Sequence, residues 1–206
     1  LQAAYDDGIG GCAIVLMHGY RYTAHEKQVA ALAQSIGFTQ ISVSHKVSPL
    51  MKLVSRGDTT VVDAYLSPIL RRYVDQVSNQ LRTNDLDPLA ASRRVGSITK
   101  LMFMQSNGGL ADAENFQGKD SILSGPAGGI VGAVQTSRMA GFDKIISFDM
   151  GGTSTDVAHY NGEYERTFET EVAGVRLRTP MMAIHTVAAG GGSIVQFDGS
   201  RYRVGP

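Results

Sequence analysis

The apolar positions of the first half alternate between strand-like runs and helix-like spacing. Residues 12–17 form a continuous apolar run of strand length, and the Thr-x-x-Glu pattern at residues 23–26 predicts the start of a helix that continues to about Ile36. Gly37 is the expected end of this helix, and residues 38–44 predict a second strand. A strand, a helix and a strand in this order favour a parallel strand pair.

A longer helix is predicted over residues 58–81. Its apolar side chains recur at intervals of three and four residues, so we expect them to form one buried stripe. They are Val62, Tyr65, Leu66, Ile69, Tyr73, Val77 and Leu81. Pro68 lies inside this stretch and is expected to bend or split the helix. The polar residues 83–94 that follow predict a surface connection or a hinge.

The second half is organised around glycine, since most of the 24 glycines lie after residue 104. A strand predicted at residues 98–104 enters a glycine-containing turn at 105–109, and the segment 124–129 leads into a short helix. Further short strands are predicted at residues 144–149, 155–160, 163–171 and 175–179. The fold class is therefore α/β with a mixed sheet.

Composition and charge exclude several classes of function. The chain has 206 residues, of which 43% are hydrophobic and 18% charged, and its formal net charge is zero. No electrostatic attraction favours a nucleic acid partner, and the apolar runs are far shorter than the roughly 20 residues of a membrane span. The single cysteine excludes an internal disulfide framework and suits a cytoplasmic protein. Because the chain opens at Leu1, without an initiator methionine or a signal peptide, we expect it to be a piece of a longer protein.

The pattern Asp-x-Gly-Gly-Thr-x-x-Asp at residues 149–156 carries the strongest chemical signal. An apolar strand ends in Asp149, turns on two glycines and returns to Asp156. Because glycine has no Cβ, the backbone N–H groups of such a turn can close on an anion. Neighbouring carboxylates would repel a phosphate directly, so they are candidates for holding Mg²⁺ or orienting a water. The alternative is a plain hairpin whose glycines serve only the turn.

A second glycine-rich segment extends from His185 to Ser193. Three consecutive glycines in it, Gly190, Gly191 and Gly192, indicate either a ligand at close range or a tight crossing of two chain segments. His185 is more typical of a structural hydrogen bond than of direct chemistry. The segment 124–129 offers either the N–H groups of a helix start to an anion or a close-packed helix start.

The motif at residues 149–156 resembles the second phosphate-binding hairpin of the superfamily that contains actin, the sugar kinases and the heat-shock chaperone ATPases. Four more stretches narrow this resemblance to the hydantoinase A and oxoprolinase family. They are residues 104–110, 123–129, 185–193 and 204–206. The first half resembles the ATP-dependent 5-oxoprolinases of this family in residues 16–20, 25–26, 56–60 and 63–68. The resemblance covers essentially the whole chain.

The resemblance implies a fragment of an actin-like ATPase fold of the ribonuclease H-like type. Residues 1–95 would form an α/β module at the end of the N-terminal hydantoinase/oxoprolinase region, and residues 96–206 would begin the hydantoinase A nucleotide-binding module. The implied reaction opens 5-oxo-L-proline to L-glutamate through phosphorylation of the lactam oxygen by ATP. Implied partners are 5-oxo-L-proline, the remaining hydantoinase A and B regions, and a second copy of the complete chain in a homodimer.

The resemblance also assigns roles to individual residues. Asp149 and Asp156 are the catalytic and metal-binding candidates. The nucleotide-binding candidates are Gly151, Gly152, Thr153, Ser154, Gly190, Gly191 and Gly192. The implied cofactors are ATP and Mg²⁺, with K⁺ as a further candidate cation in the complete enzyme.

Two features of the family pattern are missing from this sequence. We find neither the superfamily's first phosphate-binding hairpin nor a glycine-rich segment for adenosine, so we expect about half of a nucleotide site and no turnover by this piece alone. Two alternatives stay open. One is an N-methylhydantoinase or acetone-carboxylase-type subunit of the same family, and the other is a non-catalytic actin-like module that only switches with its nucleotide.

Overall fold

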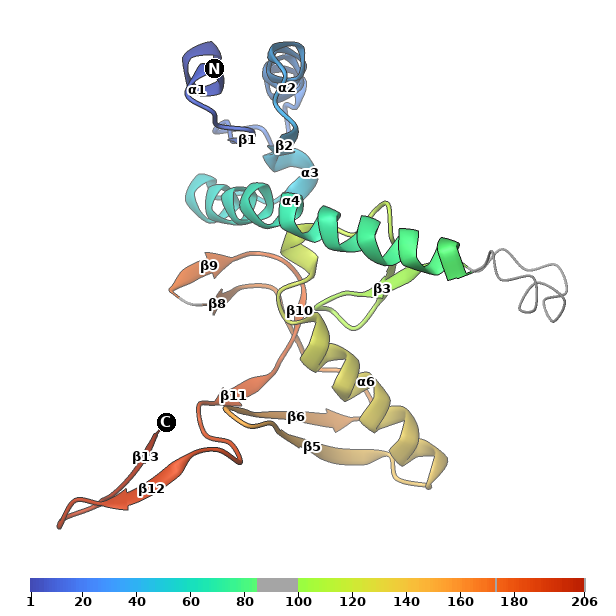
Figure 1. The fold of residues 1–206 in the computed structure, drawn as a ribbon, viewed down its shortest axis with the longest axis vertical. Helices are drawn as coiled ribbons and strands as arrows, with labels where there is room; N and C mark the ends of the chain where they lie inside the picture. Colours follow the sequence, from blue (N-terminus) through green and yellow to red (C-terminus); the bar gives the residue numbers. More distant parts are fainter. Residues whose placement is uncertain (85–99, 173, 206) are drawn as a thin grey trace, which may run out of the picture. The chain divides into compact units, whose positions relative to one another are not determined.

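A computed structural model of the chain describes residues 1–84, 100–172 and 174–205 (Figure 1). The chain divides into two compact units. The first comprises Leu1–Phe103, Leu110–Ile122 and Phe168–Thr179, and the second comprises Met104–Gly109, Leu123–Thr167 and Pro180–Pro206. Both units combine helices with strands, which confirms the α/β class. The predicted module boundary at residue 95 and most of the connection predicted at 83–94 lie outside the described residues.

The first unit contains a parallel strand pair with helices. Its elements are α1 (Gln2–Asp6), β1 (Gly11–Ile14), α2 (Ala24–Ile36), β2 (Gln40–Val43), α3 (Ser44–Val47), α4 (Leu53–Asn84), β4 (Leu110–Asp112), the 3-10 helix η1 (Gly118–Asp120), β8 (Thr170–Val172) and β9 (Val175–Leu177). Strands β1 and β2 pair in parallel, with Ile14 opposite Val43. The parallel pair predicted from the strand, helix, strand order is therefore confirmed. Strand β3 (Met102–Met104) carries the chain into the second unit.

Helix α2 begins and ends where the sequence predicts, but its capping is different. Gly37 takes a left-handed conformation with φ of 118° and ends the helix. Thr23 precedes the first turn, yet its side chain makes no capping hydrogen bond. Glu26 turns inward instead and accepts a hydrogen bond of 2.9 Å from the backbone N–H of Leu16. The predicted capping box is therefore wrong, because buried donors beside β1 and β2 take the carboxylate that would have closed it.

Glu26 is the centre of a buried polar cluster in the first unit. The side chains of Glu26, Ser44 and Arg56 are fully buried. Ser44 Oγ donates to Glu26 Oε1 at 2.5 Å, His45 Nδ1 lies 2.7 Å from Glu26 Oε2, and Arg56 Nε donates to Ser44 Oγ at 2.9 Å. Burial raises the pKa of Glu26, but hydrogen bonds from Ser44, Leu16 and His45 outweigh it and place this pKa below its ordinary value.

Helix α4 is one continuous helix through Pro68, so the predicted split does not occur. The predicted buried stripe is also wrong, since Tyr65, Ile69 and Tyr73 are 73%, 51% and 56% exposed. The helix buries a mainly polar set that comprises Ser55, Arg56, Thr59, Thr60, Asp63 and Val74. Of these side chains, Arg56, Thr59 and Asp63 hydrogen-bond to other segments of the unit, and apolar periodicity does not register such polar contacts.

Asp63 illustrates how α4 is held. Its carboxylate accepts a hydrogen bond of 2.7 Å from Ser42 Oγ at β2 and another of 3.2 Å from the backbone N–H of Lys119 in η1. Gly118 of η1 packs closely against α4, because a Cβ at this position would lie 2.7 Å from the backbone nitrogen of Ser67. Helix α4 thus joins β2 and η1 through polar contacts.

The second unit is built on antiparallel strands. Its elements are α6 (Ser124–Met139), β5 (Lys144–Met150), β6 (Thr155–Asn161), β7 (Arg166–Thr167), β10 (Met181–Met182), β11 (His185–Val187), β12 (Ile194–Phe197) and β13 (Tyr202–Gly205). Strands β11, β6 and β5 form a three-stranded sheet in this order. The single strand predicted at 163–171 is two strands, β7 and β8, which belong to different units.

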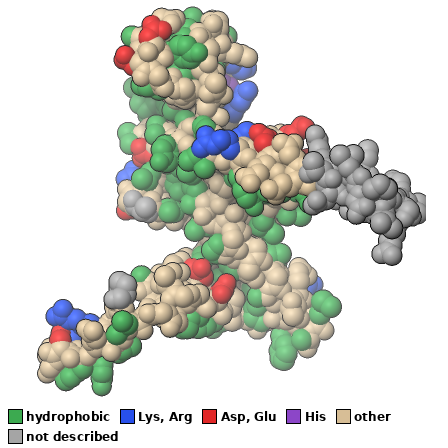
Figure 2. Space-filling view, viewed as in Figure 1, with side chains coloured by type: hydrophobic (Ala, Val, Ile, Leu, Met, Phe, Trp, Pro, Cys, Tyr) green, Lys and Arg blue, Asp and Glu red, His purple; other side chains and the backbone are tan. Residues whose placement is uncertain are grey.

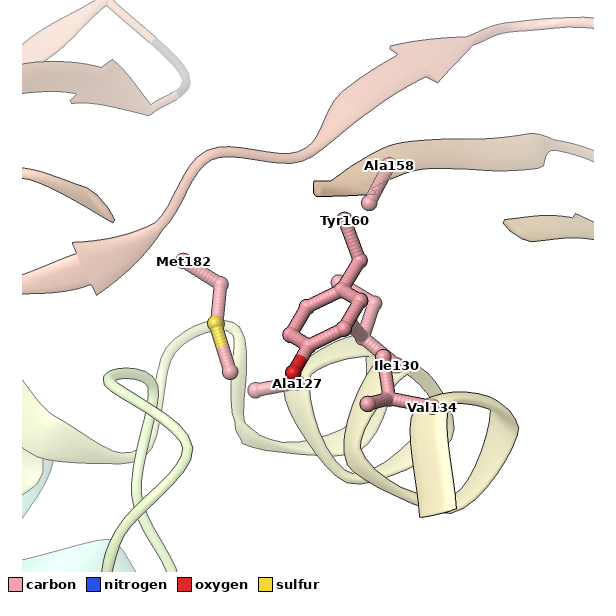
Figure 3. Packing of buried hydrophobic residues seen from close by; sticks show 6 residues of the cluster. All are labelled: Ala127, Ile130, Val134, Ala158, Tyr160 and Met182. Carbon is pink, nitrogen blue, oxygen red and sulfur yellow. The ribbon is translucent and has the colours of Figure 1, made fainter. Parts of the chain in front are cut away.

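Helix α6 packs on one face of this sheet. Ala127, Ile130 and Val134 of the helix point toward Ala158 and Tyr160 of β6 (Figure 3). The helix begins at Ser124, so the glycine-containing stretch 124–129 is its first part rather than a loop before it. Buried Ser106 supports this start, because its Oγ accepts a hydrogen bond of 3.0 Å from the backbone N–H of Leu123.

The β12–β13 hairpin ends the described chain. Hydrophobic side chains lie on the surface over this hairpin (Figure 2), where Phe197 and Tyr202 are 61% and 75% exposed. Asp198 closes its turn, and hydrogen bonds from Arg201, Ser200 and Arg203 lower the pKa of this carboxyl to about 2. Within the described ranges, no helix is both long and apolar enough to cross a membrane.

Candidate functional site

The two predicted acids lie directly opposite each other on the β5–β6 hairpin. Asp149 on β5 pairs with Asp156 on β6, next to the turn at 151–154. Because side chains alternate along a strand, both carboxylates lie on the same face of the sheet, together with Ser147 and Ala158. This is the face on which α6 packs. Strand register therefore brings together two acids that are seven positions apart in the sequence.

Both acids line a cavity of about 250 Å³ between the sheet and α6. Ile130 and Ala133 of the helix and Ala158 of the sheet contribute apolar wall. Gly129 lies beside one of the acids, since a Cβ placed there would be 3.7 Å from Asp149 Oδ2, an ordinary van der Waals distance. The start of α6 therefore lies close to the Asp149 carboxylate.

The two carboxylates differ in their support. Asp156 Oδ1 accepts a hydrogen bond of 2.6 Å from Thr186 Oγ1 on β11. For Asp149, the described part of the chain offers no side-chain hydrogen bond or ion pair. Neither acid is paired with a described lysine or arginine, although like charges opposite each other on a sheet are destabilising. Such an arrangement suits a cation between or beside the two groups.

The turn between the acids is open. No atom lies within 4 Å of the Cβ position of Gly152, and Gly151, Gly152 and Thr153 are exposed. Gly151 N–H closes the turn onto the carbonyl of Ser154 at 2.9 Å. Among the described residues, the N–H groups of Gly152, Thr153 and Ser154 have no recorded acceptor. Backbone donors and two hydroxyl groups are therefore available at the surface for an anion.

The second glycine-rich segment lies behind this turn. Gly191 N–H donates to the carbonyl of Gly151 at 2.9 Å, and Gly192 N–H donates to the carbonyl of Gly152 at 2.8 Å. A Cβ on Gly190 would lie only 2.5 Å from the carbonyl oxygen of Gly151. The two predicted glycine sites are thus one structure, in which the close crossing of the segments requires glycine.

The segment 189–193 is also tied to the sheet and to itself. Buried Thr155, the first residue of β6, donates from Oγ1 to the carbonyl of Ala189 at 2.7 Å. Gly190 N–H donates to Ser193 Oγ at 2.9 Å. These bonds fix the backing segment, which in turn binds the carbonyls of Gly151 and Gly152.

His185 does not join the acids. It lies opposite Val157 on the sheet, one position before Thr186, and so points to the other face. There it lines a shallow groove with Ile146, His159 and Glu165. Among the described residues its side chain has no recorded hydrogen bond, so the structural hydrogen bond expected for His185 is not found there.

Sequence reasoning missed Thr186 and Gly129. Thr186 follows His185 on a short strand, and only the pairing with β6 shows that it faces Asp156. Gly129 lies in the segment 124–129, a candidate helix start for an anion, but its position beside Asp149 depends on the crossing of α6 over the sheet. Strand alternation places Thr186 on the same face as Asp156, but only once the pairing of β11 with β6 is known.

The donor set fits Mg²⁺ with a phosphate ligand. The described residues contain no group of three or more histidine, cysteine, aspartate or glutamate side chains arranged to hold a metal. Mg²⁺ commonly keeps several waters and takes only one or two carboxylates, with substrate phosphates completing the shell. The two acids beside the open backbone turn match this preference of Mg²⁺. They do not match a metal site that is built entirely from protein ligands.

Comparison with known proteins gives consistent similarities. The sequence model of the hydantoinase/oxoprolinase family matches residues 56–206. The chain is 44% identical to 5-oxoprolinase 1 of Arabidopsis thaliana over 207 residues, covering 100% of this chain and 16% of that protein. It is 42% identical to 5-oxoprolinase of Saccharomyces cerevisiae over 212 residues, covering 100% of this chain and 15% of that protein.

Comparison with a solved structure supports the fold that the sequence predicts. The ATP-dependent caprolactamase from Pseudomonas jessenii matches with a TM-score of 0.78 at 28% sequence identity, covering 98% of this chain and 28% of that chain. The coverage of 16% and 15% means that this chain spans about a sixth of the length of the oxoprolinases that it resembles. The actin-like ATPase type of α/β fold expected from the sequence agrees with this likeness.

Proposed function

Because this chain belongs to the hydantoinase/oxoprolinase family, we propose that it forms the phosphate-binding part of an ATP-dependent 5-oxoprolinase. The complete enzyme would hydrolyse 5-oxo-L-proline to L-glutamate. One observation carries the proposal, namely the opposite placement of Asp149 and Asp156 beside the open turn at Gly152. Identities of 44% and 42% to 5-oxoprolinases support the choice of substrate.

A five-membered lactam is an unactivated amide, and its carbonyl reacts slowly with water. When bound, ATP with Mg²⁺ supplies a phosphoryl group to the lactam oxygen, which turns this oxygen into part of a good leaving group. The chain's own contribution is to position the phosphates and their cation. Positioning and electrostatic stabilisation account for most of the catalysis in phosphoryl transfer.

Each part of the site has a role in this proposal. Asp149 and Asp156 would hold Mg²⁺, which commonly takes one or two carboxylates and keeps several waters. The free N–H groups of Gly152 and Thr153, and the hydroxyl groups of Thr153 and Ser154, donate to phosphate oxygens. The glycines at 190–192 pack against the turn and bind two of its carbonyl groups, and they hold it in the shape that exposes these donors.

The complete site needs other parts of the longer protein. The sequence offers one phosphate-binding turn, and the superfamily clasps its nucleotide with two. We propose that the remaining hydantoinase A and B regions supply the second turn, the adenosine site and the lactam site. The 206-residue chain alone would then bind nucleotide weakly and turn over no substrate.

The alternative within the family is another ATP-dependent reaction, such as that of an N-methylhydantoinase or an acetone-carboxylase-type subunit. The likeness to a caprolactamase at 28% identity shows that the same fold occurs in an enzyme named for a different lactam. The higher identity to 5-oxoprolinases favours 5-oxo-L-proline over these substrates.

The test uses a complete enzyme that contains this segment, supplied with ATP, Mg²⁺ and one candidate substrate at a time. We expect glutamate and inorganic phosphate to appear in equal amounts from 5-oxo-L-proline. Phosphate release with only a hydantoin, a larger lactam or a ketone would overturn the substrate assignment. Nucleotide-dependent assembly without any turnover would support a non-catalytic switch instead.

A further inference from the structure

Three side chains form a row across the three strands of the second unit. Thr186 on β11 is opposite Asp156 on β6, and Asp156 is opposite Asp149 on β5. All three therefore lie on the face that carries α6. Only the first pair is joined, through the 2.6 Å hydrogen bond from Thr186 Oγ1 to Asp156 Oδ1.

We propose that Thr186 is a positioning residue, which orients the Asp156 carboxylate for the cation that accompanies the phosphates. This inference rests on the function proposed above. The terminal torsion of an aspartate is broad, so an unsupported carboxylate samples many orientations. A hydroxyl that donates to one oxygen of a charged carboxylate makes a strong hydrogen bond and restricts this rotation. In the described part of the chain, Asp156 Oδ2 has no recorded partner, which leaves it available to a cation or its water.

The location of Thr186 links the acid to the turn. Strand β11 continues into the segment 189–193, whose N–H groups hold the carbonyls of Gly151 and Gly152. The same short stretch of chain therefore fixes one carboxylate through Thr186 and the anion-binding turn through its glycines. Asp149 has no comparable support among the described residues, so the two acids are predicted to differ in how rigidly they are held.

A structural role for Thr186 makes different predictions. Threonine suits a strand because it is β-branched, and valine has the same shape without the hydroxyl. Serine keeps the hydroxyl and loses the branching methyl group. If Thr186 acts through its hydroxyl, Thr186→Ser preserves its effect and Thr186→Val removes it, whereas a role in strand packing gives the opposite order.

The experiment compares both variants in the complete enzyme. Bound Mn²⁺ is measured by electron paramagnetic resonance in the presence of a non-hydrolysable ATP analogue, and the Mg²⁺ dependence of turnover is measured in parallel. Loss of an outer-shell partner typically weakens metal affinity by about 10- to 100-fold, and we expect this loss for Thr186→Val. Thr186→Ser should stay close to the parent enzyme, and the KM for 5-oxo-L-proline should not change in either variant.

A double-mutant comparison tests whether the effect passes through Asp156. Thr186→Val should add little to the loss of Mn²⁺ affinity in an Asp156→Asn background, but should have its full effect in an Asp149→Asn background. Parent-like Mn²⁺ affinity in Thr186→Val, or equal losses in the valine and serine variants, would overturn the positioning role. If the parent enzyme itself neither binds Mn²⁺ with nucleotide nor hydrolyses ATP, the proposed function fails as well.

Discussion

A side chain at Gly190 would collide with the backbone of Gly152, because a Cβ built there lies 2.7 Å from the carbonyl carbon of Gly152. The reverse is not true, since nothing lies within 4 Å of a Cβ built on Gly152 itself. Two glycines in contact thus have different requirements. Gly190 is needed for the close approach of two chain segments, and Gly152 is needed only if a ligand occupies the open space beside it.

This asymmetry predicts opposite results for two matched variants. Gly190→Ala should destabilise the chain by about 1–3 kcal/mol, as overpacking does elsewhere. Gly152→Ala should leave stability almost unchanged, because neither a contact nor a left-handed φ opposes it. In the complete enzyme, however, Gly152→Ala should weaken nucleotide binding. Urea unfolding and nucleotide titration separate the two effects, and equal stability losses in both variants would contradict this account.

Removal of either acid should affect chemistry rather than folding. Asp149→Asn and Asp156→Asn keep the side-chain shape, and each removes one of two like charges that face each other. Stability should therefore be unchanged or rise by about 0.2–1 kcal/mol. ATP-dependent turnover in the complete enzyme should fall on the order of 100-fold. Thermal unfolding and phosphate release are the measurements. Normal turnover in one variant would remove that carboxylate from the proposed cation site.

Glu26 should be important for the stability of the first unit. Glu26→Ala leaves the donors of Leu16, Ser44 and His45 without their acceptor, and we expect a loss of about 3 kcal/mol or more. The measurement is urea unfolding of the 206-residue chain. A loss below about 1 kcal/mol would show that water or neighbouring groups replace the carboxylate.

The same residue predicts an acid dependence of stability. The pKa of Glu26 is lower in the folded chain than its ordinary value of about 4.3. Its contribution is therefore fully present above that value and is lost as the pH falls below it and through the folded pKa. Glu26→Gln cannot titrate and should show a shallower decline over this range. Parallel declines in the parent chain and the glutamine variant would assign the acid sensitivity to other groups.

The outer face of β5 should promote self-association of the isolated chain. Ile146 and Phe148 are 73% and 65% exposed on the face that points away from α6, and exposed apolar strands promote association. Ile146→Thr combined with Phe148→Thr should reduce self-association in sedimentation experiments. Ile145→Thr is the matched control, because Ile145 packs against the core and its substitution should destabilise instead. Unchanged association in the double variant would contradict the prediction.

Much of the chain's local organisation was predictable. The ends of α2, the parallel pairing of β1 with β2 and the β5–β6 hairpin follow from apolar spacing and from glycine at positions such as Gly37. The candidate acids were found in the same way, because a strand that ends in Asp149 and returns through Asp156 is a local pattern. Local patterns of this kind depend on neighbours in sequence.

The errors have a common cause. Helix α4 buries Arg56 and Asp63 and exposes Tyr65, since buried polar groups elsewhere in the unit select the face that packs. Glu26 leaves its expected capping role for the same reason. Apolar periodicity counts side chains on one helix and carries no information about the donors and acceptors that meet it.

The sequence by itself determined the α/β class, the hairpin with its two acids, and the glycines that permit close backbone approach. Only the tertiary structure decided that Gly190 supports the turn at Gly152 and that Thr186 holds Asp156. The reason is that strand register and segment crossing set which residues meet across long separations. A spacing rule describes a single segment, whereas a site of this kind arises where several segments meet.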